Sequence, residues 1–513
     1  MAEEPSLKLR TARTIKWNLI DKVSSQVLYA VTGWVLANRL SQEDFGLVGT
    51  VLIFQAFANI FVDSGFSSAL LQRKNPTQLD YSSVLWFNIT VATFIYAILW
   101  LAAPLIAIEF NDMRLIDLSR VMFLAFIINA TAIVQTNRLM KQMTVRMIAI
   151  SNFIGLIISS VVGIYLALND FGAWAVVWQT ITLASVKSLI LWITSHWLPS
   201  LVFSLESIKS IFNEGVGVMG SSLLNTLSQK LCSIVIGLST GMRALGYYTQ
   251  ADKWSVMGTA SLSQVVTASF LPVLSQFQDD RERFNRAAAK MNRFTAYVTF
   301  PAMCMLIAMA TPIFHLLFGT KWDASIALFQ ILLLRGIFTI LTSLYNNYIV
   351  ALGRSSKIIV AELVKDIASI IAIVATLPYM GLSTPDDPTQ GLRIMLWGQL
   401  AASVITWYVT LKMVSNLTGR GTGRFIVDLL PYLMQGALIT IVMLTLSNVI
   451  TGNIPLLCAQ FAAAAIIYLG INTILHSTIQ REMLQYIFYR FVKNKKDAVS
   501  YTHLRAHETR RHL

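Results

Sequence analysis

Residues 83–108 read SVLWFNITVATFIYAILWLAAPLIAI and contain no Asp, Glu, Lys or Arg. As an α-helix this run would be about 39 Å long, at about 1.5 Å per residue, which exceeds the roughly 30 Å of a bilayer's hydrocarbon core. A helix also satisfies its own backbone hydrogen bonds, as any segment that crosses hydrocarbon must. The run therefore predicts a transmembrane helix.

Thirteen further apolar runs of comparable length recur along the chain. Together with the first, they place predicted spans near 16–37, 46–68, 83–108, 116–136, 147–168, 172–193, 213–238, 254–275, 294–318, 323–350, 358–380, 391–415, 427–450 and 454–476. The pattern predicts an all-α integral membrane protein with about fourteen transmembrane helices.

The composition of the whole chain agrees with this fold class. Of the 513 residues, 55% are hydrophobic and 13% are charged, and the mean hydropathy is +0.61. Soluble domains carry about 25% charged residues, so this chain has too little polar surface for a soluble protein. The net charge of +14 is spread over short loops and not gathered in a basic and aromatic patch. That distribution argues against a nucleic-acid partner.

Basic residues fall unevenly on the two sides of the predicted membrane. With the N-terminus in the cytoplasm, the cytoplasmic segments carry 25 Lys and Arg residues and the opposite loops carry 7, Lys253 among them. Cytoplasmic loops are typically enriched in these residues. We therefore predict an even number of spans, with both termini in the cytoplasm.

Two short motifs recur at a similar distance. FGL at residues 45–47 is followed by LGY at 245–247, and APLI at 103–106 is echoed by TPIF at 311–314. The repeat predicts two six-helix lobes related by an axis along the membrane normal. We predict an N-terminal lobe at 1–205, a C-terminal lobe at 206–420, and two peripheral helices with a cytoplasmic tail at 421–498.

The last residues have a different character. The segment VSYTHLRAHET at 499–509 resembles one reading frame of a common sequencing adapter. We interpret residues 499–513 as an artefact of this kind, so His503, His507 and His512 are not read as a metal site.

Motifs of catalysis are not found in the sequence. It has no GxxxxGK[ST] phosphate-binding loop, no zinc-protease motif and no nucleophile elbow. The three cysteines lie far apart within apolar runs, where neither a disulfide nor a metal site is expected. We expect no enzymatic activity, no cofactor and no metal.

Five basic residues lie inside the predicted spans. A charged side chain at the centre of a bilayer costs about 2.5–3.5 kcal/mol or more, so each is expected to face a cavity or a partner. Arg335 and Lys230 lie deep in their spans and are predicted to line a cavity. Lys22 and Lys187 lie nearer the cytoplasmic edge, where they either line the cavity or extend to the interface. With Lys365 they form a set of cations that predicts an anionic substrate.

Acidic residues also lie in the spans. Lys365 has Glu362 three residues before it and Asp366 beside it, and pairing within this group is the preferred interpretation. Asp21 and Asp63 are either structural polar groups or cation-coupling sites.

Four side-chain amides in the spans are candidates for contacts with sugars: Gln55, Asn59, Asn225 and Gln229. Hydrogen bonds between packed helices explain them equally well.

Several motifs resemble those of a known family. They are LSQEDFGLV at 40–48, FVDSGFSSALLQR at 61–73, FLPVLSQFQDD at 270–280, FGTKW at 318–322 and ALGR at 351–354. Over roughly residues 10 to 415 the chain resembles Wzx-type exopolysaccharide and O-antigen flippases, most of all the colanic-acid exporter type. This type belongs to the multidrug/oligosaccharidyl-lipid/polysaccharide exporter superfamily.

The resemblance implies a flippase in the bacterial inner membrane. Its substrate would be an undecaprenyl-pyrophosphate-linked oligosaccharide repeat unit, moved to the periplasmic leaflet by alternating access. The implied partners are this lipid, the bilayer, a polysaccharide polymerase and glycosyltransferases. Two alternatives stay open: a cation-coupled drug exporter of the same superfamily, and a non-transporting scaffold of a polysaccharide synthase complex.

Overall fold

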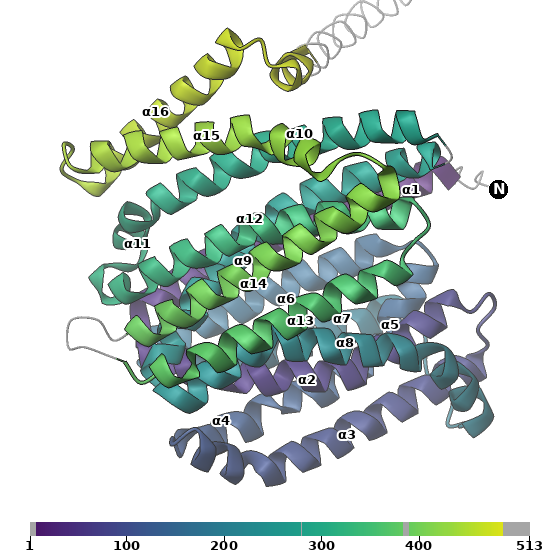
Figure 1. Cartoon of the computed structure of the whole chain (residues 1–513). Coiled ribbons are helices and arrows are strands. Elements are labelled where there is room, and N and C mark those ends of the chain that lie inside the picture. The colour runs from purple at the N-terminus through teal and green to yellow at the C-terminus, as the bar shows by residue number, and fades with distance from the viewer. Residues whose placement is uncertain (1–6, 279, 383–388, 486–513) are drawn as a thin grey trace, which may run out of the picture. The chain divides into compact units, whose positions relative to one another are not determined.

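The computed structural model describes residues 7–278, 280–382 and 389–485, with the backbone alone for 7–16, 19, 62–69, 72, 211–218, 221, 265–273 and 275. Within this part of the chain every regular element is a helix (Figure 1). The α-helices are α1 (Leu7–Arg39), α2 (Gln42–Gln72), α3 (Gln78–Glu109), α4 (Arg114–Met122), α5 (Leu124–Lys141), α6 (Val145–Leu168), α7 (Trp174–Ser195), α8 (Leu205–Thr240), α9 (Met242–Leu274), α10 (Arg281–Ala308), α11 (Ala310–Phe318), α12 (Asp323–Ala351), α13 (Ser356–Thr376), α14 (Gln390–Thr418), α15 (Thr422–Ser447) and α16 (Asn453–Ile474). Three single turns of 3-10 helix are η1 (Ser275–Phe277), η2 (Thr320–Trp322) and η3 (Leu377–Tyr379).

The helices confirm the predicted all-α membrane fold. Each of the fourteen predicted runs falls on one helix or on two consecutive helices, with α4 and α5 covering 116–136 and α10 and α11 covering 294–318. By length and composition alone, nine helical stretches of the described chain qualify as spans, or ten if α10 and α11 form one span bent by 58°. The number fourteen stays a prediction.

Local sequence signals set the ends of several helices. Thr77 caps α3: its side chain accepts the backbone N–H of Asp80, and the Asp80 side chain accepts the N–H of Thr77 in return. This reciprocal pair satisfies two of the donors that a helix N-terminus leaves free. At the end of α12, Gly353 adopts φ +68°, a left-handed conformation that favours glycine and stops the helix.

Contacts group the chain into two compact units. Unit 1 contains residues 1–257, 317–331 and 369–399, and unit 2 contains 258–316, 332–368 and 400–513. In unit 1, α6 packs against α1 and α7, while α8 packs against α2 and α3. In unit 2, α15 packs against α10 and α16. The predicted boundaries at 205 and 420 stay a prediction.

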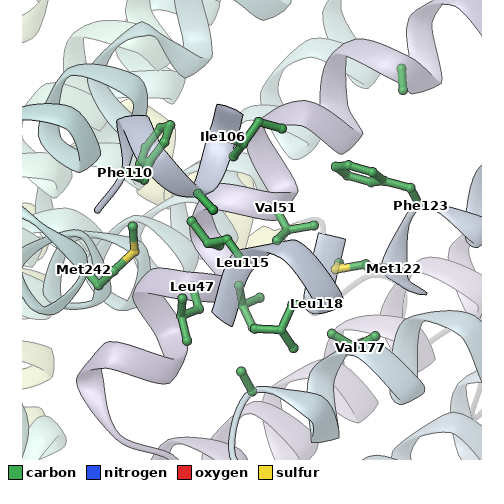
Figure 2. Close-up of a cluster of buried hydrophobic side chains, with 14 of the residues drawn as sticks. Leu47, Val51, Ile106, Phe110, Leu115, Leu118, Met122, Phe123, Val177 and Met242 are labelled. Atoms are coloured by element: carbon green, nitrogen blue, oxygen red, sulfur yellow. The ribbon is translucent and has the colours of Figure 1, made fainter. Parts of the chain in front are cut away.

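An apolar cluster fixes one end of unit 1. Figure 2 shows its side chains converging from α2, the end of α3, α4, α7 and α9, and Leu115, Met122 and Phe123 are fully buried in it. Burying a side chain of this size contributes about 1.5–3 kcal/mol. The cluster therefore makes a rigid support for the turn between α1 and α2.

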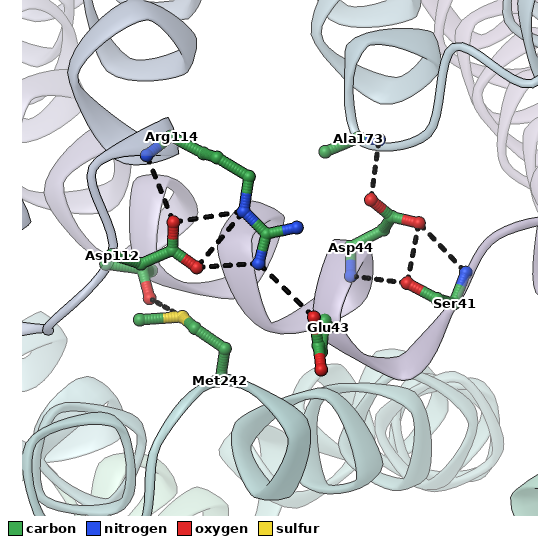
Figure 3. A network of polar contacts seen from close by, with 8 residues as sticks. Ser41, Glu43, Asp44, Asp112, Arg114, Ala173 and Met242 are labelled. Carbon is green, nitrogen blue, oxygen red and sulfur yellow. Dashed lines mark hydrogen bonds and ion pairs between the residues drawn. The ribbon is translucent and has the colours of Figure 1, made fainter.

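Paired charges hold this α1–α2 turn from one side (Figure 3). Arg114 Nη2 lies 2.7 Å from Asp112 Oδ2 and 3.3 Å from Glu43 Oε2. The hydrogen bond from Arg114 is the main reason that the pKa of the Asp112 carboxyl lies below its ordinary value.

Asp44 holds the turn from the other side. Its carboxylate accepts the Ser41 N–H at 2.9 Å, the Ser41 hydroxyl at 2.7 Å and the Ala173 N–H at 3.0 Å. A Cβ atom on Gly172 would lie 2.8 Å from Asp44 Oδ1, so glycine is needed beside it. We call Ser41, Glu43, Asp44, Asp112, Arg114 and Ala173 the turn network; it joins the α1–α2 turn to the starts of α4 and α7.

The segment before α12 forms hydrogen bonds with the end of α1. Lys321 Nζ donates to the carbonyl oxygens of Asn38 at 2.7 Å and Leu40 at 3.0 Å. Trp322, which is fully buried, donates from Nε1 to the carbonyl of Ala37 at 2.9 Å. The last carbonyls of a helix lack partners within it, so these donors complete α1. The FGTKW motif thus has a structural role.

Two glycines of the predicted repeat meet where α2 approaches α9. A Cβ atom on Gly46 would lie 1.9 Å from the carbonyl oxygen of Met242, and one on Gly246 would lie 1.8 Å from that of Gln42. In both cases the obstacle is the carbonyl four residues before the other glycine. The contact is therefore symmetric, which supports the repeat of 45–47 at 245–247. Neither position has room for a side chain.

Candidate functional site

Helix α1 presents one polar face to α6. Asn152 Nδ2 donates to Asp21 Oδ1 at 3.1 Å, and its distance to Ser25 Oγ is 3.4 Å. Further along the same face, Thr32 donates to Ser160 Oγ at 2.7 Å. Asp21 thus has a structural partner in this structure. Its possible role in cation coupling stays a prediction.

A second polar face of α1 lies about 100° away from the first. Lys22, Gln26, Tyr29 and Gly33 are spaced by three or four residues and so form one stripe. The Lys22 side chain is exposed, as is that of Tyr29, whereas Gly33 is buried. Exposing the Lys22 ammonium to lipid would cost free energy. The stripe is therefore expected to face water or a polar ligand.

Lys187 and Lys230 occupy different helices of unit 1. Lys187 lies on α7 where this helix packs closely on α6, and its Cβ is 3.6 Å from the position that a Cβ on Gly155 would take. Lys230 lies on α8, and both lysines are half-buried. Neither forms an ion pair with any carboxylate of the described residues, nor does a hydrogen bond join one to the other. They are therefore two separate uncompensated cations.

Arg335 lies in the part of α12 that belongs to unit 2. Its side chain is half-buried and has no carboxylate partner in the described part of the chain. The next residue, Gly336, packs closely on α9, because a Cβ there would lie 2.5 Å from Thr259 Oγ1. Because neighbouring residues on a helix point about 100° apart, Arg335 lies beside this contact and not in it.

Lys365 differs from Lys187, Lys230 and Arg335 because it forms ion pairs with neighbouring carboxylates. Its ammonium is hydrogen-bonded to the Glu362 carboxylate and lies 4.0 Å from Asp366 Oδ1. The structure thus brings these three residues together, in the arrangement that the sequence favoured. Two acids around one lysine give a group with net negative charge, which leaves Lys365 less suited to bind an anion.

The predicted sugar contacts divide into two kinds. Gln229 Nε2 donates to Asn225 Oδ1 at 2.9 Å on an exposed part of α8. On α2, Gln55 Oε1 is buried without a hydrogen-bond partner among the described residues, and Asn59 is half-buried. The side chain of Asp63 lies outside the described residues.

Sequence analysis missed a polar turn of α9. It counted Lys253 among the loops because the apolar run begins at 254, whereas α9 begins twelve residues earlier, at Met242. Lys253 lies against Gly33 of α1: a Cβ on Gly33 would be 2.6 Å from Lys253 Nζ. The repeat could have revealed this, because Gly46 lies within the first turns of α2 and Gly246 corresponds to it.

The chain matches a known protein family. The family described as "Polysaccharide biosynthesis protein" matches residues 35–327, which is more than half of the chain.

Three relatives are identical to this chain at about a quarter of the aligned positions. The teichuronic acid biosynthesis protein TuaB of Bacillus subtilis (strain 168) is 27% identical over 68% of this chain and 73% of its own length. The succinoglycan biosynthesis transport protein ExoT of Rhizobium meliloti (strain 1021) is 26% identical over 72% and 75%. The lipopolysaccharide biosynthesis protein WzxC of Escherichia coli (strain K12) is 26% identical over 65% and 68%.

Solved structures share the fold. The lipid II flippase MurJ in an inward closed conformation aligns with a TM-score of 0.74 at 16% identity, covering 92% of this chain and all of that one. An inward-facing multidrug resistance transporter of the MATE family aligns with a TM-score of 0.57 at 16% identity, covering 77% and 96%. At such low identity these matches establish the fold alone.

Proposed function

This chain belongs to the polysaccharide biosynthesis protein family, and we propose that it flips lipid-linked oligosaccharides for polysaccharide assembly. The substrate is an undecaprenyl-pyrophosphate-linked repeat unit, which moves from the cytoplasmic to the periplasmic leaflet of the bacterial inner membrane. Relatives named for teichuronic acid, succinoglycan and lipopolysaccharide biosynthesis support this class of substrate.

The single observation that carries the proposal is the set of cations without carboxylate partners. Lys187, Lys230 and Arg335 lie within long helices and form no ion pair among the described residues. A cation within a membrane span that lacks a partner is destabilising, so these three half-buried cations are expected to serve another purpose. A pyrophosphate headgroup supplies the missing negative charge.

Flipping by a protein matches the physics of such a lipid. Sugar hydroxyls and a pyrophosphate cannot cross hydrocarbon unaided, because removing their hydration costs too much free energy. The prenyl chain, in contrast, can remain in the lipid. The membrane potential, negative inside, favours outward movement of an anion by about 2.3 kcal/mol per charge per 100 mV. The protein therefore needs to supply a polar path and positive charge. Alternating access between the two sides of the membrane provides such a path.

Orientation and partners follow from the same proposal. Both termini lie in the cytoplasm, as the distribution of Lys and Arg predicts. Glycosyltransferases supply the substrate on that side, and a polymerase consumes it on the other. The chain itself moves the lipid without making or breaking covalent bonds.

Two rivals are less well supported. A scaffold that does not transport would be expected to pair all of its intramembrane charges, yet Lys365 is paired while Arg335 has no carboxylate partner among the described residues. A cation-coupled drug exporter would be expected to use buried carboxylates, and among the predicted acids Glu362 and Asp366 contact Lys365, while Asp21 accepts from Asn152.

Polymer production tests the function. A strain that lacks the gene should stop making its surface polysaccharide and should accumulate the lipid-linked repeat unit. Wild-type protein should restore the polymer, and Arg335→Gln should not, at equal protein level in the membrane. The readouts are polymer mass and the amount of the lipid-linked intermediate.

Lys357→Gln is the matched control. Lys357 is exposed at the start of α13 and has no role in the proposal, so this variant should restore the polymer fully. Normal polymer in the strain without the gene would overturn the function. Full restoration by Arg335→Gln would remove Arg335 from the site.

A further inference from the structure

One turn of α9 carries three nitrogen donors without acceptors. Gln250 is fully buried, and neither atom of its side-chain amide has a hydrogen-bond partner among the described residues. Trp254 Nε1 is likewise buried without a partner, and Lys253 forms no ion pair or hydrogen bond within the described chain. Buried donors are nearly always satisfied in proteins, so three in one turn indicate a ligand.

The Lys253 ammonium lies in a defined position against α1. It lies on the backbone of Gly33, at 2.6 Å from where a Cβ would be, and 5.9 Å from the centre of the Trp254 ring. The indole itself packs against Phe318, with ring centres 5.3 Å apart. Glycine at 33 is what gives the ammonium room. Lys253 and Trp254 thus meet α1 at Gly33, and Gln250 lies one turn earlier on the same face of α9.

The position of Lys253, at Gly33, lies at one end of the polar stripe of α1. Gly33 follows Lys22 by eleven residues, which returns to the same face within about 20° and corresponds to about 16 Å along the helix. Gln26 and Tyr29 lie between them on the stripe. The distance is too great for one phosphate group to touch both lysines. Lys253 therefore belongs to a second position and not to the surroundings of Lys22.

We propose that Gln250, Lys253 and Trp254 form a second anion-binding position, which receives the pyrophosphate of the substrate after Lys22. The assignment of this ligand rests on the proposed function. Lys253 provides the charge, while the Gln250 amide and the Trp254 indole donate neutral hydrogen bonds. In the proposed orientation the position is nearer the periplasm. An anion that moves outward along α1 therefore reaches it late in transport.

Binding of a short lipid pyrophosphate tests the site. The full chain is placed in phosphatidylcholine nanodiscs and titrated with farnesyl pyrophosphate, with farnesol as the uncharged probe and empty nanodiscs as the baseline. Lys253→Gln should weaken binding of the pyrophosphate about tenfold or more, because it removes a charge-assisted hydrogen bond. Binding of farnesol should not change.

Further variants separate binding from folding. Lys253→Arg should keep the affinity within about threefold of wild type. Gly33→Ala should weaken binding without changing any charge, because the new methyl group displaces the ammonium. Lys74→Gln, at an exposed lysine of the α2–α3 loop, should bind like wild type. The melting temperature of Lys253→Gln should not fall, because an unpaired buried charge has been removed.

The outcomes distinguish this site from the proposed function. If wild-type protein binds farnesyl pyrophosphate and Lys253→Gln binds it equally well, the second position is wrong and the flippase proposal stands. If wild-type protein binds no more than empty nanodiscs, both fail. A lower melting temperature together with equal loss of both probes would show that Lys253 is structural, which also overturns the inference.

Discussion

Two polar regions of unit 1 use charge in opposite ways. In the turn network, Arg114 is bound by two carboxylates and Asp44 accepts three hydrogen bonds. In the turn of α9 that contains Gln250, Lys253 and Trp254, none of these three side chains has a hydrogen-bond acceptor among the described residues. Both regions contact α1 or the turn that follows it. Their difference in charge pairing therefore does not arise from their being in different parts of the molecule.

The comparison separates structural charges from functional ones. A paired group at a turn stabilises the fold by fixing the backbone that it binds. A buried cation without a partner has the opposite effect on stability, so it is a candidate for a role in function. Arg335, Lys187 and Lys230 are half-buried and resemble Lys253 in having no carboxylate partner among the described residues, whereas Lys365 resembles the turn network.

The largest effect is expected where α2 meets α9. Gly46→Leu or Gly246→Leu should abolish polymer production and lower the amount of folded protein, because each side chain would meet a backbone carbonyl less than 2 Å away. Overpacking costs about 1–3 kcal/mol where side chains can move, and more is expected against backbone. Polymer mass and size-exclusion chromatography measure the two effects.

A glycine in open space provides the control. A Cβ on Gly220 of α8 would meet nothing within 4 Å. Gly220→Ala should therefore be neutral or stabilise the helix by up to about 1 kcal/mol. Normal polymer from Gly246→Leu would show that the two helices need not approach each other in the working protein.

A smaller effect is expected in the turn network. Asp44→Ala should lower the free energy of unfolding by about 1–3 kcal/mol, because the buried N–H of Ala173 loses its acceptor. Asp44→Asn keeps an oxygen and should lose less. Thermal unfolding of the purified variants measures this. Equal melting temperatures for Asp44→Ala and wild type would mean that the network does not hold the turn.

The smallest effect is expected at the paired lysine. Lys365 and Glu362 are both more than a third exposed, so their ion pair should contribute no more than about 1 kcal/mol. The double variant Glu362→Gln/Lys365→Gln should therefore keep full polymer production. Loss of polymer at an unchanged protein level would show that this pair is needed for transport and would support a role for Lys365 in binding the anion.

The fold could be predicted from apolar runs, since length and hydrophobicity decide which helices suit a bilayer. The breaks at Phe123 and Met309 were not predicted, because a short interruption of a helix leaves the hydropathy unchanged. The start of α9 was also missed, because its first turns contain polar residues that the structure buries, among them Gln250.

The candidate site was predicted only in part. Cations within spans were visible in the sequence, and the pairing of Lys365 followed from the spacing of its neighbours. Whether Arg335 or Lys230 has a partner depends on other helices, which the sequence does not place. Lys253 was missed for the same reason: its position on Gly33 is a contact between residues far apart in the chain.

The sidedness of the lipid-linked repeat unit tests the central claim most directly. In spheroplasts, periodate that does not cross the membrane oxidises sugars of the outer leaflet alone. With wild-type protein, most of the lipid-linked unit should be oxidised. With Arg335→Gln at equal protein level, it should accumulate and stay protected. An oxidised fraction equal to that of wild type would contradict the claim that unpaired helix cations carry the anionic headgroup across.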